Sequence, residues 1–292
     1  MLTRRAALGG MTGAMVARAE RAAATIVPPL NLTQQGGWVR WQTHGVQRMA
    51  YVPDGAKAGR PATIDMPGAI PVPVASDGFF FVGIDRDSVD QGWLLMQIRD
   101  EVKVQTITIA PRAWRIENID APFHPSAVPD DAFARIRAGE LARIEAARAQ
   151  MTGAQGWRQD FIWPVKGRIS GRFGSQRIYR GAPGAYHSGL DIAPGAGATY
   201  VAPTDGVVVL AAASPFTLEG NLLILDHGMG LNSAFLHAQR LLVSEGDRVV
   251  QGQPLGLVGM TGRATGPHLH WSLRWREARL DPLLILPAGA SA

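Results

Sequence analysis

The chain contains no cysteine. Disulfide bonds, thiolate metal sites and cysteine nucleophiles are therefore excluded, and any metal must be held by histidine and carboxylate side chains. Lysine occurs only at Lys57, Lys103 and Lys166, so arginine supplies most of the formal net charge of +5. A basic surface could hold the protein near an anionic polymer or a membrane face. No basic run with interleaved aromatic residues is present, and we therefore expect no nucleic-acid partner.

Long hydrophobic runs are also absent, because no stretch reaches the roughly 20 apolar residues of a membrane-spanning helix. Residues 1–24 nevertheless have the pattern of a signal peptide, in which Arg4-Arg5 precede a weakly apolar stretch and small residues at 22–24 offer a cleavage site. The twin arginine favours twin-arginine export, but Ala7 stands where the strongest such signals carry an aromatic residue. General secretion therefore stays open, and a disordered arginine-rich tail is the alternative. We expect an exported protein with no transmembrane anchor after leader removal.

The composition predicts a packed globular core, since 46% of the 292 residues are hydrophobic and 18% are charged, and the length allows two modest domains or one large one. The strand patterns described below predict a mainly β protein. Residues 25–118 are expected to form a β-sandwich-like accessory domain. Apolar runs at 37–41, 78–83 and 102–109 predict strands there, with glycine and proline between them. No catalytic pattern concentrates in this part.

Residues 119–152 are expected to form a linker and a connecting α-helix. A proline-rich stretch leads to Asp130, an N-cap candidate that opens a helix to about Gln150. Glu140 and Arg143 form a favourable i,i+3 pair that we place on the exposed side. The stripe expected to pack against a neighbouring domain consists of Phe133, Ile136, Leu141 and Ile144.

Residues 153–292 are expected to form a compact antiparallel β domain, because short strands alternate there with glycine-rich turns and no helical pattern intervenes. The two closest histidines, His268 and His270, would enter one pocket from the same face of a strand, although this pair alone could equally be two solvated histidines on an edge strand. His187 and Asp191 could share a metal from a strand or bend, although this spacing alone is weak evidence. His237 closes an apolar strand, where a single histidine is usually structural.

These residue types fit a catalytic zinc site. Such a site generally uses three protein ligands and leaves the fourth position to a water, which becomes the nucleophile as the metal lowers its pKa. Two histidines and one carboxylate supply the ligands, and the two remaining histidines could hydrogen-bond the water and the developing oxyanion.

Together these stretches resemble the lysostaphin-type, or LytM-domain, zinc endopeptidases. The resemblance covers about residues 163–282, over a third of the chain, and its motifs occur in the expected order. They include Gly171-Arg172-Phe173-Gly174, His187-Ser188-Gly189-Leu190-Asp191-Ile192-Ala193, Ala202-Pro203-Thr204-Asp205-Gly206-Val207-Val208, Leu225-Asp226-His227-Gly228, Leu236-His237, Gly259-Met260-Thr261-Gly262 and Thr265-Gly266-Pro267-His268-Leu269-His270.

The resemblance implies that His187, Asp191 and His270 bind one Zn²⁺ per chain, while His237 and His268 assist catalysis. His227 matches the family but is interpreted as structural. The family's usual tyrosine before the assisting histidine is Phe235 here, a change expected to affect fine details of substrate contact.

The function implied is that of a zinc metalloendopeptidase acting on peptide cross-links of bacterial peptidoglycan. The leader and the arginine bias favour a periplasmic or envelope protein of a Gram-negative cell, and hence a DD-endopeptidase rather than an enzyme for glycine bridges. The alternative is a catalytically inactive LytM-like activator of a cell-wall amidase. Inactive members typically lack one or more ligands, whereas all five positions are filled here. A purely structural wall-binding protein would leave the histidine arrangement without a reason.

Overall fold

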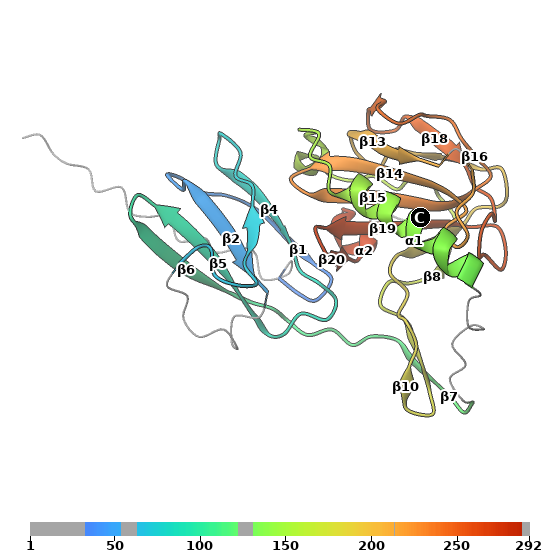
Figure 1. Cartoon of the computed structure of the whole chain (residues 1–292), viewed down its shortest axis with the longest axis horizontal. Coiled ribbons are helices and arrows are strands. Elements are labelled where there is room, and N and C mark those ends of the chain that lie inside the picture. Colours follow the sequence, from blue (N-terminus) through green and yellow to red (C-terminus); the bar gives the residue numbers. More distant parts are fainter. Residues whose placement is uncertain (1–32, 54–62, 122–130, 213, 288–292) are drawn as a thin grey trace, which may run out of the picture.

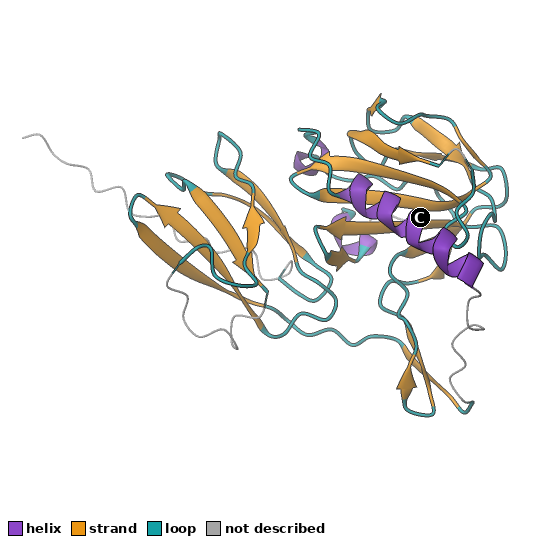
Figure 2. Cartoon of the chain, viewed as in Figure 1, coloured by secondary structure: helices purple, strands orange, loops and turns teal. Residues whose placement is uncertain are grey.

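The computed structural model describes residues 33–53, 63–121, 131–212 and 214–287. The signal peptide expected at 1–24 and most of the expected linker lie outside these residues. Strands dominate the described part (Figure 2), and the prediction of a mainly β protein is confirmed. Within that part, no helix combines the length and apolar character needed to cross a membrane.

The N-terminal strands form two hydrogen-bonded sheets (Figure 1). Their facing sides share one apolar core, in which Phe80, Val82 and Leu94 are completely buried. The strands predicted at 37–41, 78–83 and 102–109 are present with shifts of one residue at their ends. The sheets consist of β1 (Trp38–Gln42) with β4 (Phe79–Gly83), and of β3 (Ile70–Val72), β2 (Arg48–Val52), β5 (Gln91–Ile98) and β6 (Glu101–Thr108).

A third sheet joins distant parts of the sequence. β7 (Ile116–Ile119) pairs in parallel with β9 (Gln176–Tyr179), which in turn pairs with β10 (Ala182–Pro183). The ion pairs Arg177–Glu117, at 2.9 Å, and Arg180–Asp120, at 2.8 Å, also link β7 to this hairpin. The three strands project from the body of the molecule as an arm (Figure 1).

The predicted helix is present as α1 (Asp131–Arg148), and Ile144 is buried as expected, but the predicted division of its faces is only partly right. Ile136 and Leu141 are exposed, whereas Glu140 is buried. The Glu140 carboxylate accepts hydrogen bonds from the backbone N–H and the hydroxyl of Thr217, both at 2.6 Å, and pairs with Arg137 at 3.0 Å. Polar contacts with the 216–219 loop therefore fix the rotation of the helix, and apolar periodicity could not reveal them.

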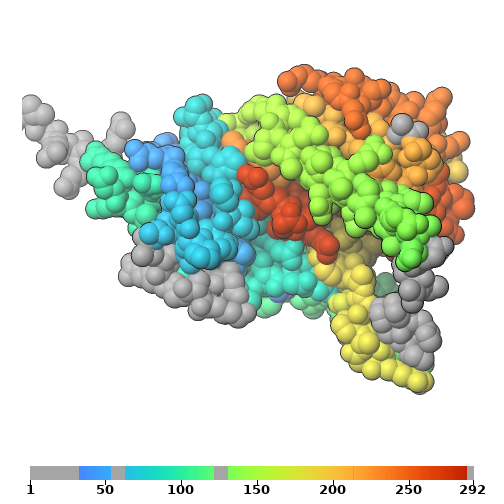
Figure 3. All heavy atoms as spheres, in the orientation of Figure 1, coloured from blue at the N-terminus to red at the C-terminus, as the bar shows by residue number. Residues whose placement is uncertain are grey.

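The C-terminal residues form the expected antiparallel β domain. An eight-stranded sheet is its main layer, and in Figure 3 α1 lies across one face of the molecule over these strands. A second, three-stranded sheet comprises β12 (Thr199–Val201), β18 (Pro254–Leu257) and β16 (Arg240–Leu241). The main sheet contains, in spatial order, β17 (Arg248–Val249), β13 (Gly206–Ala211), β14 (Asn221–Gly228), β15 (Leu231–Ala238), β19 (Leu269–Trp275), β11 (Leu190–Ala193) and β8 (Arg168–Gly171), with β20 (Ala278–Leu280) paired to β19.

The N-terminal sheets pack directly on the C-terminal one. A Cβ on Gly83 would lie 2.6 Å from the Cβ of Trp275, so the absence of a side chain lets β4 approach β19 and β20 closely. The Tyr51 and Trp275 rings meet edge to face at 6.2 Å.

Two short helices complete the described structure, η1 (Gly156–Arg158) and α2 (Pro282–Ile285). Asp281 caps α2 and binds Arg112 at 2.8 Å, which ties this end of the chain to the segment leading to β7.

Candidate metal centre

The centre of the site is a cross-strand pair. β11 and β19 are antiparallel neighbours, and their register places Asp191 directly opposite His270. Side chains that oppose each other on one face of a sheet have Cβ atoms about 4.5–5.5 Å apart, so the carboxylate and the imidazole meet. His187 approaches from the segment before β11. Its backbone is held by hydrogen bonds to Gly174 at 2.9 Å and to Ser175 at 2.8 Å.

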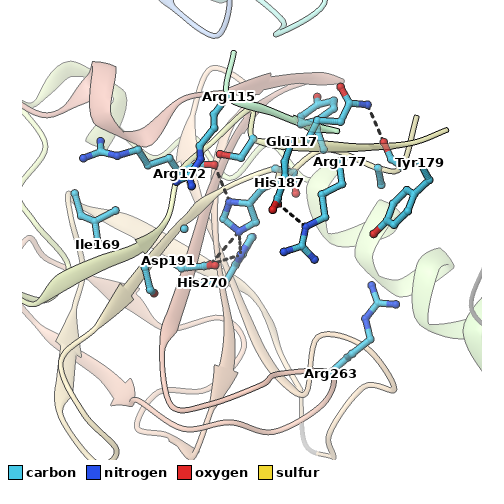
Figure 4. Close-up of a pocket in the computed structure, with 18 residues that line it drawn as sticks. Arg115, Glu117, Ile169, Arg172, Arg177, Tyr179, His187, Asp191, Arg263 and His270 are labelled. Carbon is cyan, nitrogen blue, oxygen red and sulfur yellow. Dashed lines mark hydrogen bonds and ion pairs between the residues drawn. The ribbon is translucent and has the colours of Figure 1, made fainter. Parts of the chain in front are cut away.

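Three ligand atoms converge from these residues. His187 Nε2 lies 3.0 Å from Asp191 Oδ1 and 3.1 Å from His270 Nδ1, and the last two atoms are 2.8 Å apart. These three atoms form what we call the ligand triangle. A tetrahedral Zn²⁺ with bonds of about 2.0–2.1 Å separates its ligand atoms by about 3.3 Å, so a small outward shift of the three side chains would fit the ligand triangle to the ion. Two imidazole nitrogens and one carboxylate oxygen are also the donor set that zinc prefers. The residues therefore fit a zinc ion (Figure 4).

Neighbouring groups orient the first imidazole. The carbonyl of Arg172 lies 3.1 Å from His187 Nδ1 and accepts its N–H, which leaves the Nε2 lone pair facing the triangle. The His270 ring lies against the backbone of Gly189, where a Cβ would come within 2.6 Å of His270 Nε2. The glycine in the motif from His187 to Asp191 thus leaves room for His270, the histidine that ends the last motif.

Charge coupling sets the protonation of the three groups. Burial by itself would raise the pKa of Asp191, but hydrogen bonds from His187 and His270 hold that pKa well below its usual range. Burial lowers the pKa of His270, against the opposing effect of Asp191. Burial also disfavours the charged form of His187, yet the hydrogen bond and charge of Asp191 outweigh it and raise the pKa. The ionised carboxylate gives the site the negative charge that a divalent cation needs.

The two other predicted histidines lie beside this triangle. His268 Nε2 is 3.7 Å from Asp191 Oδ1, and its Nδ1–H donates to the Gly266 carbonyl at 2.8 Å. His237 Nδ1–H donates to the Thr261 carbonyl at 2.8 Å. The His237 and His268 rings are 5.0 Å apart between centroids. Both side chains therefore have Nδ1 engaged by a backbone carbonyl, and all five predicted residues converge.

His237 is held in a demanding conformation. Its φ of 64° lies in the left-handed region, where a side chain is uncommon, and its N–H donates to the Glu219 carbonyl at 2.9 Å. Burial lowers its pKa, and the nearby imidazoles oppose a positive charge further. A neutral His237 at pH 7 presents an acceptor nitrogen to the site.

The remaining described histidines, His44 and His227, lie outside the group of three that could hold a metal ion. His227 is completely buried, donates from Nδ1 to the Asp205 carbonyl at 2.8 Å and accepts at Nε2 from the Ser233 hydroxyl at 2.7 Å. Its role is structural, as interpreted from the sequence. His44 is exposed and belongs to no metal-binding group among the described residues, and His124 lies outside them.

Phe235 packs in the core beside the site. The ring is completely buried and stacks on Tyr200 with centroids 5.5 Å apart. The expected effect of the missing hydroxyl on substrate contact stays a prediction.

An open groove of about 1170 Å³ begins at the triangle and continues along the arm. His187, Asp191 and His270 line it together with residues of β7, β9 and the 184–188 segment (Figure 4). The sequence did not predict that β7 contributes to the groove, because this contact joins segments about sixty positions apart without a shared motif.

Residues 185–282 match the sequence profile described as Peptidase family M23. This chain contains an M23 peptidase domain. The matched residues include the triangle and both neighbouring histidines.

Curated relatives share the M23 part. The peptidoglycan DD-endopeptidase ShyA of Vibrio cholerae is 40% identical over 117 residues, which cover 38% of this chain and 26% of that protein. The murein hydrolase activator NlpD of Escherichia coli is 32% identical over 131 residues, covering 45% of this chain and 31% of that protein. The chain thus spans about a quarter to a third of the length of these relatives.

One solved structure matches almost the whole chain. A putative M23 peptidase from Pseudomonas aeruginosa aligns with a TM-score of 0.64 at 25% identity, over 90% of this chain and 97% of that one. The match extends beyond the M23 domain, so the fold of the N-terminal sheets is shared as well.

Proposed function

We propose that this protein is an exported zinc metalloendopeptidase that hydrolyses peptide cross-links of peptidoglycan, as a DD-endopeptidase. The observation that carries the proposal is the convergence of His187, Asp191 and His270 at the end of an open groove, with His237 and His268 beside them. A DD-endopeptidase is also among the relatives of the M23 domain.

The triangle would hold the ion through His187 Nε2, Asp191 Oδ1 and His270 Nδ1. When bound, zinc lowers the pKa of a water towards neutrality and polarises the carbonyl under attack. His237 and His268 supply the proton chemistry. Each has its Nδ1–H engaged by a backbone carbonyl, so its Nε2 can take a proton from the attacking water and return it to the leaving amine. In its protonated form the same nitrogen donates to the developing oxyanion.

A second function has support from the activator NlpD, which is 32% identical over the matched residues. In that case the groove would bind a partner enzyme and the peptide bond would stay intact. The intact set of five residues favours hydrolysis, because an activator has no need of two oriented histidines next to a metal site.

The test is digestion of purified cross-linked muropeptides by the protein, with zinc, with a chelator, and with a His270→Ala variant. We expect monomers with zinc, intact dimers with the chelator, and recovery when zinc is added back. A His44→Ala variant is the matched control, since that imidazole is exposed and remote from the triangle. Intact dimers under all conditions, together with bound zinc, would favour the activator, and full activity of His270→Ala would refute the ligand assignment.

A further inference from the structure

More positively than negatively charged side chains line the groove beside the metal centre. Its lining contains the arginines Arg115, Arg172, Arg177 and Arg263, but only two carboxylates, Glu117 and Asp191. Asp191 belongs to the metal triangle. A bound divalent cation would increase the positive potential of the groove further. The ligand that complements such a groove is anionic.

Two of these arginines occupy opposite sides of the cavity. In Figure 4 the guanidinium groups of Arg177 and Arg263 both point into the open space beside His187 and His270. Arg177 extends from β9 and contacts the side chain of Tyr179, and its Nε donates to Glu117 at 2.9 Å. This pair fixes the direction of the Arg177 side chain.

Arg263 has no such partner. Its backbone N–H donates to the Leu218 carbonyl at 2.9 Å, which fixes the loop that precedes His268. Within the described residues, its guanidinium group makes no hydrogen bond or ion pair. Arg263 is exposed, so its charge is hydrated, and the guanidinium group is accessible to an incoming anion.

We propose that Arg263 and Arg177 form a carboxylate-binding subsite that receives a free carboxylate adjacent to the scissile bond. A guanidinium group presents paired N–H donors that match a carboxylate, and a second guanidinium on the opposite wall holds the same group from the other side. The inference rests on the proposed function and specifies its substrate class.

Cross-link chemistry shows which substrates meet this requirement. In a D-alanyl–diaminopimelate cross-link, the carbon whose amine is acylated also carries a free carboxylate. In a glycine bridge every backbone carboxyl next to the scissile bond is part of an amide, and glycine has no side chain. The subsite therefore favours the direct cross-link, on grounds independent of the leader and of composition.

The experiment compares two fluorescent peptides that contain the D-alanyl–diaminopimelate bond, one with a free carboxylate next to it and one with a carboxamide. Anisotropy with the zinc-loaded full chain in the first seconds after mixing gives binding, and chromatography gives hydrolysis. Because a hydrogen-bonded charged group contributes about 1.5–3 kcal/mol, we expect the acid to bind about 10- to 100-fold tighter than the amide. Arg263→Gln should remove most of this preference and Arg263→Lys should restore part of it.

Arg248→Gln is the matched control, because Arg248 is exposed on β17 and does not line the groove. The subsite is refuted if acid and amide bind equally, if neither binds, or if Arg248→Gln lowers the preference as much as Arg263→Gln. Equal hydrolysis of equally bound peptides would leave the hydrolase standing without the subsite. Tight, Arg263-dependent binding of the acid without cleavage would leave the subsite standing and refute the proposed hydrolase.

Discussion

The guanidinium group of Arg86 lies 4.3 Å from the centroid of the Tyr186 ring, on the residue that immediately precedes His187. Arg86 is only 7% exposed and also donates to the Gly174 carbonyl at 3.2 Å. The Gly174 N–H in turn donates to the His187 carbonyl. A buried arginine from the segment after β4 thus contacts both the residue before His187, a candidate metal ligand, and the glycine whose N–H binds the His187 carbonyl. The N-terminal sheets take part in building the site and do not merely precede it.

We therefore expect Arg86→Gln to weaken zinc binding about 10- to 100-fold, the range found when groups behind metal ligands are removed. Arg86→Lys keeps the charge but loses the flat stacking surface and the paired donors, so its affinity should be intermediate. Competition with a chromophoric chelator measures the affinity, and thermal unfolding of the metal-free proteins reports any general loss of stability. Arg48→Gln, on the exposed side of β2, is the control. Equal zinc affinity of Arg86→Gln and the parent would contradict this prediction.

The two histidines beside the triangle should affect turnover rather than metal binding. We expect His268→Ala and His237→Ala each to lower kcat about 10²- to 10⁴-fold, the usual contribution of a positioned acid or base. Zinc affinity should remain close to that of the parent, because neither ring completes the triangle. Muropeptide hydrolysis and chelator competition on the same samples separate the two effects. Loss of zinc with either variant would instead place that histidine among the ligands.

Sequence reasoning could predict the arrangement of those site residues that lie close together along the chain. His268 and His270 lie two residues apart, and their same-face placement follows from strand geometry once Leu269 is in the core, where it is completely buried. The pairing of Asp191 with His270 needed the family resemblance, because no local pattern fixes which strands become neighbours.

Non-local polar contacts were beyond sequence reasoning. The parallel pairing of β7 with β9 and the contact of Arg86 with Gly174 join segments about 60 and 90 positions apart. Glu140 shows the same limit in a helix, since a charged residue was placed outside by its chemistry but is buried by hydrogen bonds to Thr217. Apolar periodicity carries no signal for such contacts.

The buried His227 predicts a pH dependence of stability. Burial lowers its pKa from 6.5 to about 4 in the folded protein. Between pH 6.5 and 4 the unfolded chain therefore binds a proton that the folded chain does not, and stability falls as the pH falls. At 1.36 kcal/mol for each pKa unit the loss is on the order of 3 kcal/mol, complete near pH 4 and absent above pH 7.

A His227→Gln variant isolates this effect. It should be less stable than the parent at pH 7, because the hydrogen bonds to Asp205 and Ser233 are not both preserved. Its stability should then decrease less steeply between pH 6.5 and 4. Urea unfolding of metal-free proteins at several pH values gives the comparison, and parallel curves for the two proteins would refute the assignment.

The approach of the His270 ring to Gly189 makes that glycine a sensitive position. A Cβ on residue 189 would lie 2.6 Å from both His270 Nε2 and the Trp271 carbonyl oxygen, closer than real Cβ contacts allow. Gly189→Ala must therefore displace β19 or rotate the imidazole, and either movement opens the ligand triangle. We expect zinc affinity to fall about 10- to 100-fold.

Gly139→Ala is the matched control, because a Cβ at that position in α1 meets nothing within 4 Å. It should leave zinc affinity unchanged and raise the unfolding free energy by about 0.5–1 kcal/mol, since alanine favours a helix. An unchanged zinc affinity of Gly189→Ala would show that His270 Nδ1 is not held in the triangle by this contact.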